Sequence, residues 1–348
     1  MKFFKELFLK LKDKKILRQI LIGVILIIFI AILGILSLHE WKGGAVGDGS
    51  TKFEIEVEPG ETANKVAKEL KSNKMIHSSK YFLYLLKFSG NISNLKQGIY
   101  VVNDGMSTWK IIKTLVEGRV KTITFTIPEG YTNRQIGDVL VKKKIVSSRD
   151  DFIKEADNSE LLKKYKIPAK TSEGYLYPET YTIPYDYKPS KVAEMMIRRF
   201  FSNLEKVEGA NRENIEELHS KVVLASIVER EAKKKDEQPL MAGVFLKRIK
   251  IGMPLESCAT VQYLFDKPKK RLLEKDLEIV SPYNTYLNKG YPPGPISNPG
   301  LPALRAAYKP TESDSLFFLV KPDGSHYFSR THKEHLEAKK KYIDVLYE

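Results

Sequence analysis

The chain has 348 residues, with 58 Lys and Arg against 43 Asp and Glu, which gives a formal net charge of +15 at pH 7. Its 42% hydrophobic and 29% charged residues are typical of folded proteins and exclude general disorder. The single cysteine, Cys258, excludes an intrachain disulfide and a cysteine-rich zinc site. A chain of this length is expected to form roughly two domains.

The first predicted element is a membrane-spanning helix. Residues 20–38 contain no charged side chain, and a helix of that length spans about 29 Å, close to the roughly 30 Å hydrocarbon layer. Residues 1–19 carry seven basic and two acidic side chains, so they are predicted to remain in the cytoplasm as a basic tail. A cleaved signal peptide is the alternative, although its apolar region is shorter and ends in small residues. We therefore predict a single-pass plasma-membrane protein whose N-terminus is cytoplasmic and whose main part is extracytoplasmic.

A small α+β module is predicted after the span. Residues 39–51 are Gly-rich and polar, typical of a flexible linker. The order strand, helix, helix, strand, helix then follows over residues 52–121, from alternation and helical spacing of apolar residues. This pattern, above all the turn at 57–62, resembles LysM domains, which bind glycans rich in N-acetylglucosamine. A generic packing module shows the same periodicity.

The larger part, residues 122–348, is predicted to be a second α+β domain. It begins with a strand at 122–127 and a helix at 133–142, followed by a helix at 190–204. A stretch dense in Pro, Gly, Asn and Tyr covers 282–302, and a hairpin over 316–329 precedes a final helix at 333–345.

The best candidate for chemistry is the predicted helix at 219–232. Leu224, Ile227 and Val228 form an apolar stripe whose next position is Glu231. A partly desolvated carboxylic acid holds its proton more strongly and can act as a general acid. Glu229 is turned away by about 200° and is expected to have another role. The alternative is a solvent-exposed glutamate that pairs with a neighbouring basic side chain.

Two loop stretches combine stiff backbone with aromatic and amide groups, at 173–181 and at 281–300. A sugar ring presents an apolar face and a rim of hydroxyls, so these groups are typical of a carbohydrate cleft. A structural loop that covers the core is the alternative. The predicted substrate-binding residues, including the second helix carboxylate, are Glu173, Tyr175, Glu229, Asn284, Tyr286 and Asn298.

Several other functions lack a matching pattern. His326, His332 and His335 do not form an H-E-x-x-H motif, and neither a G-x-S-x-G elbow nor a phosphate-binding glycine loop occurs. No metal and no cofactor are therefore predicted. The basic charge is compatible with nucleic acid, but the predicted extracytoplasmic location argues against that partner.

Residues 53–348 resemble the YceG/MltG family of endolytic murein transglycosylases. The stretches that carry the resemblance are IPEG (127–130), EGYLYPETY (173–181), LASIVEREA (224–232), AGVFLKRIKIGMPLE (242–256), SPYNTY (281–286), GYPPGPISNPG (290–300) and GSHYF (324–328). The chain departs from the family pattern at Cys258, where an Asp is usual, and at Glu179.

The resemblance implies that Glu231 is the catalytic residue of a transglycosylase domain. The implied reaction cleaves the β-1,4 bond after N-acetylmuramic acid without water and leaves a 1,6-anhydro ring. The expected partners are peptidoglycan glycan strands and the lipid bilayer around residues 20–38. A peptidoglycan synthase or a division protein is compatible as a further partner. A non-catalytic peptidoglycan-binding scaffold and a hydrolase that acts on the same glycan are the alternatives.

Overall fold

The computed structural model describes residues 14–343, which fall into two compact units. One unit ends at Thr122 and also includes Pro184–Asp186, and the other comprises Ile123–Ile183 and the residues from Tyr187 onward. Residues 1–13 of the predicted basic tail and residues 344–345 of the predicted final helix lie outside the described part of the chain.

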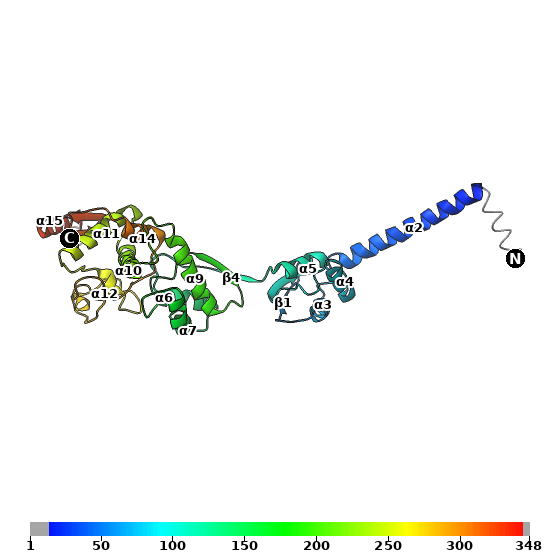
Figure 1. Cartoon of the computed structure of the whole chain (residues 1–348), viewed down its shortest axis with the longest axis horizontal. Helices are drawn as coiled ribbons and strands as arrows, with labels where there is room; N and C mark the ends of the chain where they lie inside the picture. Colours follow the sequence, from blue (N-terminus) through cyan, green and yellow to red (C-terminus); the bar gives the residue numbers. More distant parts are fainter. Residues whose placement is uncertain (1–13, 344–348) are drawn as a thin grey trace. The chain divides into compact units, whose positions relative to one another are not determined.

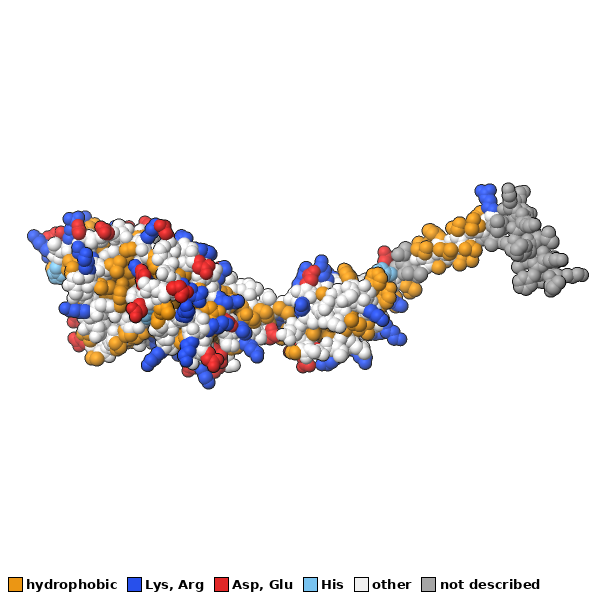
Figure 2. Space-filling view, in the orientation of Figure 1, with side chains coloured by type: hydrophobic (Ala, Val, Ile, Leu, Met, Phe, Trp, Pro, Cys, Tyr) orange, Lys and Arg blue, Asp and Glu red, His pale blue; other side chains and the backbone are white. Residues whose placement is uncertain are grey.

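The N-terminal helix α2 (Lys14–Gly43) contains the predicted membrane span. Its segment Leu21–Gly43 has a mean hydropathy of 3.2 and is long enough to cross a membrane. Figure 2 shows hydrophobic side chains along this helix. The helix continues to Gly43, so residues 39–43 of the predicted linker are helical. The adjacent glycine then ends the helix, and the Gly44 amide donates to the Glu40 carbonyl at 2.8 Å.

The module after α2 has the predicted order of elements: β1 (Lys52–Val57), α3 (Ala63–Ser72), α4 (Ser79–Phe88), β2 (Gly98–Asn103) and α5 (Thr108–Glu117). The strands are antiparallel, and Ile55 is opposite Tyr100. Thr62, Ser78 and Ser107 cap the three helices through side-chain oxygens. Inward-facing residues of the strands and helices form a core separate from that of the second unit.

The second unit is mostly helical, with two pairs of short strands in its described part (Figure 1). The sequence predicts a more even mixture of helices and strands, because only some of the helices have a recognisable pattern in the sequence. The elements are β3 (Thr122–Thr126), α6 (Asn133–Lys142), α7 (Arg149–Ala156), α8 (Ser159–Lys164), β4 (Thr180–Pro184), α9 (Pro189–Leu204), α10 (Ile215–Glu231), η1 (Lys235–Glu237), α11 (Gln238–Lys250), α12 (Cys258–Gln262), α13 (Glu274–Leu277), α14 (Leu301–Tyr308), β5 (Phe317–Val320), β6 (His326–Ser329) and α15 (His332–Tyr342).

Helix α10 is the central helix of this unit, and α11, α12 and α14 pack against it (Figure 1). All residues from Val222 to Val228 are buried. The predicted single apolar stripe is therefore too narrow a description, because a helix that is apolar on all sides is surrounded by protein. Burial on every side fixes the last turn of α10, which ends at Glu231.

Candidate active site

The Glu231 carboxyl group lies at the C-terminal end of α10 and faces the start of α12. The Ser257 hydroxyl and the Ala259 amide both donate to its Oε1, the amide at 3.2 Å. Within residues 14–343, no hydrogen bond to Oε2 is formed. One carboxylate oxygen is thus held by two donors, and the other is left for a ligand.

Glu231 lines a cavity of about 210 Å³ and is half-buried, so it does not extend into open solvent. This volume is smaller than the roughly 300–1,000 Å³ of ordinary ligand pockets. The walls come from α10, α11, the turn before α12, the loop before residue 290 and the C-terminal hairpin and helix: Glu231, Arg248, Glu256, Cys258, Tyr286, Phe317, Phe318 and His335.

Arg248 of α11 is the buried cation of the cavity. Its Nε donates to the Leu316 carbonyl at 2.6 Å and its Nη1 to the Leu255 carbonyl at 2.7 Å, with the Glu256 carboxylate 3.4 Å from Nη1. Burial lowers the pKa of the Arg248 guanidinium, and Glu256 and Glu231 oppose that shift. These fixed contacts hold the turn that carries Ser257.

The turn before α12 is also held by the loop at 281–286. The Ser257 amide donates to the Thr285 hydroxyl at 3.1 Å, and the Glu256 amide donates to the Thr285 carbonyl at 3.1 Å. Glu256 has a φ of 48°, in the left-handed region that a non-glycine residue seldom adopts. The Tyr286 hydroxyl lies 3.1 Å from the Cys258 sulfur, so Tyr286 is a predicted substrate-binding residue that does line the cavity.

Asn284, from the same loop, is fully buried. Its Nδ2 donates to the carbonyls of Leu277 and Ile279 at 2.8 Å each, and its Oδ1 accepts from the Tyr286 amide at 3.0 Å. Every polar atom of this side chain is therefore used within the protein. The structure places Asn284 inside the loop, beside the residue that reaches the cavity.

Glu173 and Asn298 meet in a buried network outside the cavity. The Asn298 Nδ2 donates to Glu173 Oε1 at 3.2 Å, and the Asn133 amide donates to the same oxygen at 3.1 Å. Burial raises the pKa of Glu173 to about 8. Asn298 also accepts from the Leu176 amide at 2.8 Å, so the two side chains join the loops around 131, 173 and 298.

Tyr175 and Glu229 are held elsewhere in the core. Tyr175 is fully buried, and its hydroxyl lies 2.9 Å from Nδ1 of His219. The Glu229 Oε2 accepts from the Gly300 amide at 2.9 Å, at the N-terminal end of α14. Burial raises the pKa of Glu229 to about 7. The structure therefore brings together Glu231 and Tyr286, whereas the other predicted site residues lie apart from the cavity.

Ser257, Arg248 and Glu256 are site residues that the sequence reasoning missed. Arg248 and Glu256 belong to the stretch 242–256, which carries the family resemblance, so that stretch could have pointed to both residues. The local pattern does not single out Arg248, because Lys247 and Lys250 stand beside it at the end of α11. Nothing local marks Ser257, because it reaches Glu231 from 26 residues away.

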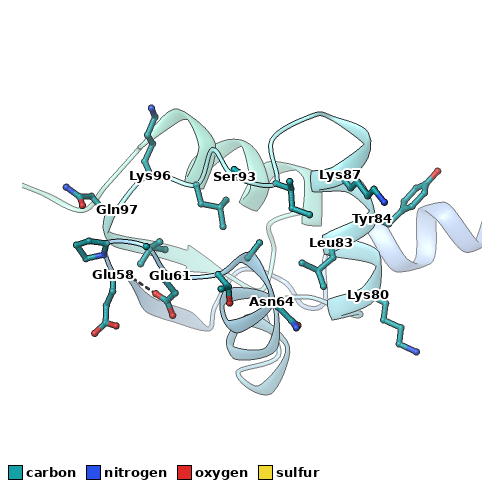
Figure 3. Close-up of a pocket in the computed structure, with 17 residues that line it drawn as sticks. Glu58, Glu61, Asn64, Lys80, Leu83, Tyr84, Lys87, Ser93, Lys96 and Gln97 are labelled. Carbon is teal, nitrogen blue, oxygen red and sulfur yellow. Dashed lines mark hydrogen bonds between the residues drawn. The ribbon is translucent and has the colours of Figure 1, made fainter.

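A second, larger hollow of about 1150 Å³ lies in the module at 52–121 (Figure 3). It runs between the turn after β1 and the segment from α4 to β2. Glu58 and Glu61 lie on one side, where the Glu58 amide donates to Glu61 Oε2 at 2.8 Å. Leu83 and Lys96 belong to the other side. This groove is much larger than the Glu231 cavity but contains no comparable buried constellation of donors.

The residues described here provide no metal centre. No group of three or more His, Cys, Asp and Glu side chains that could hold a metal ion occurs among residues 14–343. His326 instead pairs with Glu237, whose Oε2 lies 2.7 Å from the His326 Nδ1. This pair joins β6 to the short helix η1.

Known proteins resemble the chain over most of its length. A Bacillus subtilis (strain 168) protein named endolytic murein transglycosylase is 36% identical over 316 residues, covering 85% of this chain and 86% of that protein. A protein of the same name from Streptococcus pneumoniae serotype 2 is 28% identical over 312 residues, which are 81% of this chain and 56% of that protein. The crystal structure of a YceG-like protein from Listeria monocytogenes aligns with a TM-score of 0.58 and 33% identity, covering 83% of this chain and 99% of that one.

The family model extends over the module and over the whole cavity. The YceG-like family matches residues 55–341, a range that includes every residue that lines the Glu231 cavity. The Bacillus relative supports this match, because it is 36% identical over 85% of this chain. The chain therefore belongs to the YceG-like family.

Proposed function

We propose that this protein is a membrane-anchored endolytic murein transglycosylase, a lyase, in which Glu231 is the catalytic acid and base. The observation that carries the proposal is the Glu231 carboxyl group, which lines a cavity with Oε1 held by Ser257 and Ala259. The names of the Bacillus and Streptococcus relatives support the same activity.

In the proposed reaction, the protonated Glu231 donates its proton to the glycosidic oxygen while the bond between that oxygen and C1 of N-acetylmuramic acid breaks. The resulting carboxylate then accepts the proton of the C6 hydroxyl as O6 bonds to C1 of the same sugar. The products are a free 4-hydroxyl on N-acetylglucosamine and a 1,6-anhydro ring. Glu231 is protonated again, so neither water nor a cofactor is consumed.

The neighbouring residues have supporting roles in this proposal. Ser257 and the amide of Ala259 fix Oε1, which leaves Oε2 to exchange the proton. Arg248 balances the charge of the carboxylates at the cavity, and Tyr286 offers a ring and a hydroxyl to the sugar. The other predicted binding residues are proposed to influence glycan binding indirectly, because they hold the loops and helix ends in place. They are Glu173, Tyr175, Glu229, Asn284 and Asn298.

The rest of the chain is proposed to keep the enzyme close to its substrate. We assign the groove at residues 52–121 to glycan binding, residues 122–348 to catalysis and α2 to an uncleaved anchor. A tethered active site acts at a high local concentration on strands near the membrane. Cleavage there would end the growth of nascent strands, with a synthase or a division protein as a plausible neighbour.

The test is product analysis with purified, uncrosslinked glycan strands. The full chain in detergent should release fragments with 1,6-anhydro ends, identified by mass spectrometry, and the Glu231→Gln variant should not. Anhydro ends formed by this variant at the wild-type rate would exclude Glu231 as the acid. A wild-type protein that binds strands but never cleaves them would favour the scaffold alternative.

A hydrolase is the second candidate, and Glu256 is the observation that favours it. Glu256 lines the same cavity as Glu231, and hydrolases of glycosidic bonds use a pair of carboxyl groups. Glu256 is, however, 3.4 Å from Arg248 Nη1 and partly engaged by it. The hydrolase would be established if the wild type formed reducing ends in place of anhydro ends and the Glu256→Gln variant no longer formed them.

A further inference from the structure

Exposed aromatic side chains gather on the module next to the end of α2. Trp41, Tyr84, Phe88 and Trp109 are 62%, 59%, 80% and 50% exposed. The rings of Tyr84 and Phe88 are stacked, with centroids 6.1 Å apart. Single exposed apolar residues are ordinary, but several large exposed aromatic side chains at the end of α2 and on the two helices that begin there indicate a contact surface.

Residues at the starts of α4 and α5 contact the last turns of α2. The Thr108 hydroxyl, one residue before Trp109, donates to the Lys42 carbonyl at 3.3 Å. The Trp41 ring stacks on His77, which precedes α4, at a centroid distance of 5.5 Å. Tyr81 of α4 contacts the His39 ring in an edge-on arrangement. The first turns of α4 and α5 therefore both begin where α2 ends.

The direction of α4 matters for this surface. In Figure 3 the labelled side chains from Lys80 to Lys87 follow α4 across the direction in which α2 leaves the module. Lys80 and Tyr84 extend toward the side of α2 and away from the middle of the groove. A helix that lies across a membrane anchor presents one long face to the membrane surface.

Basic side chains outnumber acidic ones on these helices. Lys80 and Lys87 are exposed on α4, and Lys110 is exposed on α5. The acidic residues in the sequences of α2, α4 and α5 are Glu40 and Glu117, whereas exposed glutamates are found on β1. Basic and aromatic side chains together are typical of surfaces that lie at the headgroup level of anionic bilayers.

We propose that this face of the module lies on the headgroup layer of an anionic phospholipid bilayer, at the point where α2 enters it. We name it the juxtamembrane face, formed by Trp41, Phe88, Trp109 and Lys110; Lys80, Tyr84 and Lys87 form its border with the groove. The inference rests on the proposed anchor and goes beyond it, because an anchor alone leaves the module free to move away from the membrane. A module held on the surface would keep its groove at a fixed height above the bilayer.

The chain provides its own reporters, because its two tryptophans, Trp41 and Trp109, both belong to the juxtamembrane face. The full chain with Trp41→Phe retains Trp109 as the single tryptophan. It is placed in vesicles of phosphatidylethanolamine and phosphatidylglycerol, with and without bromine atoms on the acyl chains near the headgroups. We expect the brominated lipids to lower the Trp109 emission at least two-fold, and iodide in the water to quench it less than in detergent.

A matched pair of variants separates the face from the anchor. Phe88→Glu with Lys110→Glu, added to Trp41→Phe, should abolish the quenching by brominated lipid while the chain still floats with the vesicles. Lys68→Glu with Ser72→Glu changes the charge equally on the exposed side of α3 and should leave the quenching unchanged. A floating chain whose Trp109 is not quenched would overturn the juxtamembrane face and leave the anchor intact. A chain that does not float would overturn both.

Discussion

The groove in the module and the cavity at Glu231 differ in size and in how their polar groups are held. The groove measures about 1150 Å³, and its lysines are exposed; Lys80 and Lys87 among them border the juxtamembrane face. The cavity measures about 210 Å³, and its Arg248 is buried with two carbonyl partners. Long exposed side chains supply affinity with little orientation, whereas fixed donors place a reacting atom. In the proposed function, binding area and chemistry therefore lie at separate sites.

The Glu231→Gln variant is the strongest test of this difference between the groove and the cavity. If the cavity performs the chemistry, the cleavage rate on purified strands should fall by about 10²–10⁴-fold, the usual contribution of a general acid–base group. Binding of strands by the module should be unchanged. Glu205→Gln, an exposed carboxylate of the same unit, is the control and should cleave at the wild-type rate. An equal loss in both variants would contradict the assignment.

The next effect is on stability, at Arg248. In Arg248→Met the buried carbonyls of Leu255 and Leu316 lose their donor, which should lower the free energy of unfolding of the second unit by about 3 kcal/mol. Arg248→Lys keeps the charge without the forked geometry and should lose less. Urea-dependent proteolysis of the full chain measures both. A difference below about 0.5 kcal/mol for Arg248→Met, within the range of ordinary surface changes, would show that the cavity is not held as described.

Stability should also depend on pH through Glu173. Its pKa is about 8 in the folded chain and about 4.3 in an unfolded one. Between those values the folded state keeps a proton that the unfolded state has released, so stability falls as the pH rises from about 4.5 to 8. We expect a loss on the order of 3 kcal/mol between pH 5.5 and 8 from this group. Glu173→Gln should reduce this slope and leave the part that comes from Glu229, whose pKa burial also raises. Glu205→Gln should keep the full slope, and equal slopes in the two variants would refute the role of Glu173.

A smaller effect is expected at Ser257. Ser257→Ala removes one of the two donors to Glu231 Oε1, which should lower kcat about ten-fold, equivalent to about 1.4 kcal/mol. Ser202→Ala removes an exposed hydroxyl of α9, away from the cavity, and should stay within about two-fold of wild type. Steady-state rates on one strand preparation compare the two. Equal rates for Ser257→Ala and wild type would mean that the hydroxyl does not position the acid.

The smallest effect belongs to the groove. Asn64 is exposed on its wall, and Asn64→Arg fills the space beside it. Affinity for long strands should fall by about five-fold, roughly 1 kcal/mol, while kcat on short fragments stays the same. Asn73→Arg, at the other end of α3, is the matched control. A loss of kcat in Asn64→Arg would show that binding and chemistry are not separate.

Local patterns predict much of this fold. The order strand, helix, helix, strand, helix expected over 52–121 is that of β1 to α5, and the helix expected at 133–142 is α6 with the same bounds. Helices α11 and α12 were not predicted. The middle of α11, Met241–Phe245, is buried on all sides and lacks a one-sided stripe, and α12 has only five residues, whose position depends on tertiary contacts.

The candidate site was predictable only in part, because its partners are far apart in the sequence. Glu231 follows from a local stripe and a motif, but Ser257 reaches it from 26 positions away. A polar loop residue looks the same whether it faces a ligand or the core. Asn298 and Glu173 were predicted to bind substrate, yet they meet each other in the interior across 125 positions.

Arg248 also makes the C-terminal hairpin indispensable to the middle of the chain. The Leu316 carbonyl that accepts from Arg248 lies just before β5, and Phe317, Phe318 and His335 complete the cavity wall. A protein truncated before residue 316 would lose that carbonyl and three wall residues together. Such a truncation would remove part of the support of Glu231, which lies some 85 positions upstream, although the residues around Glu231 in the sequence remain.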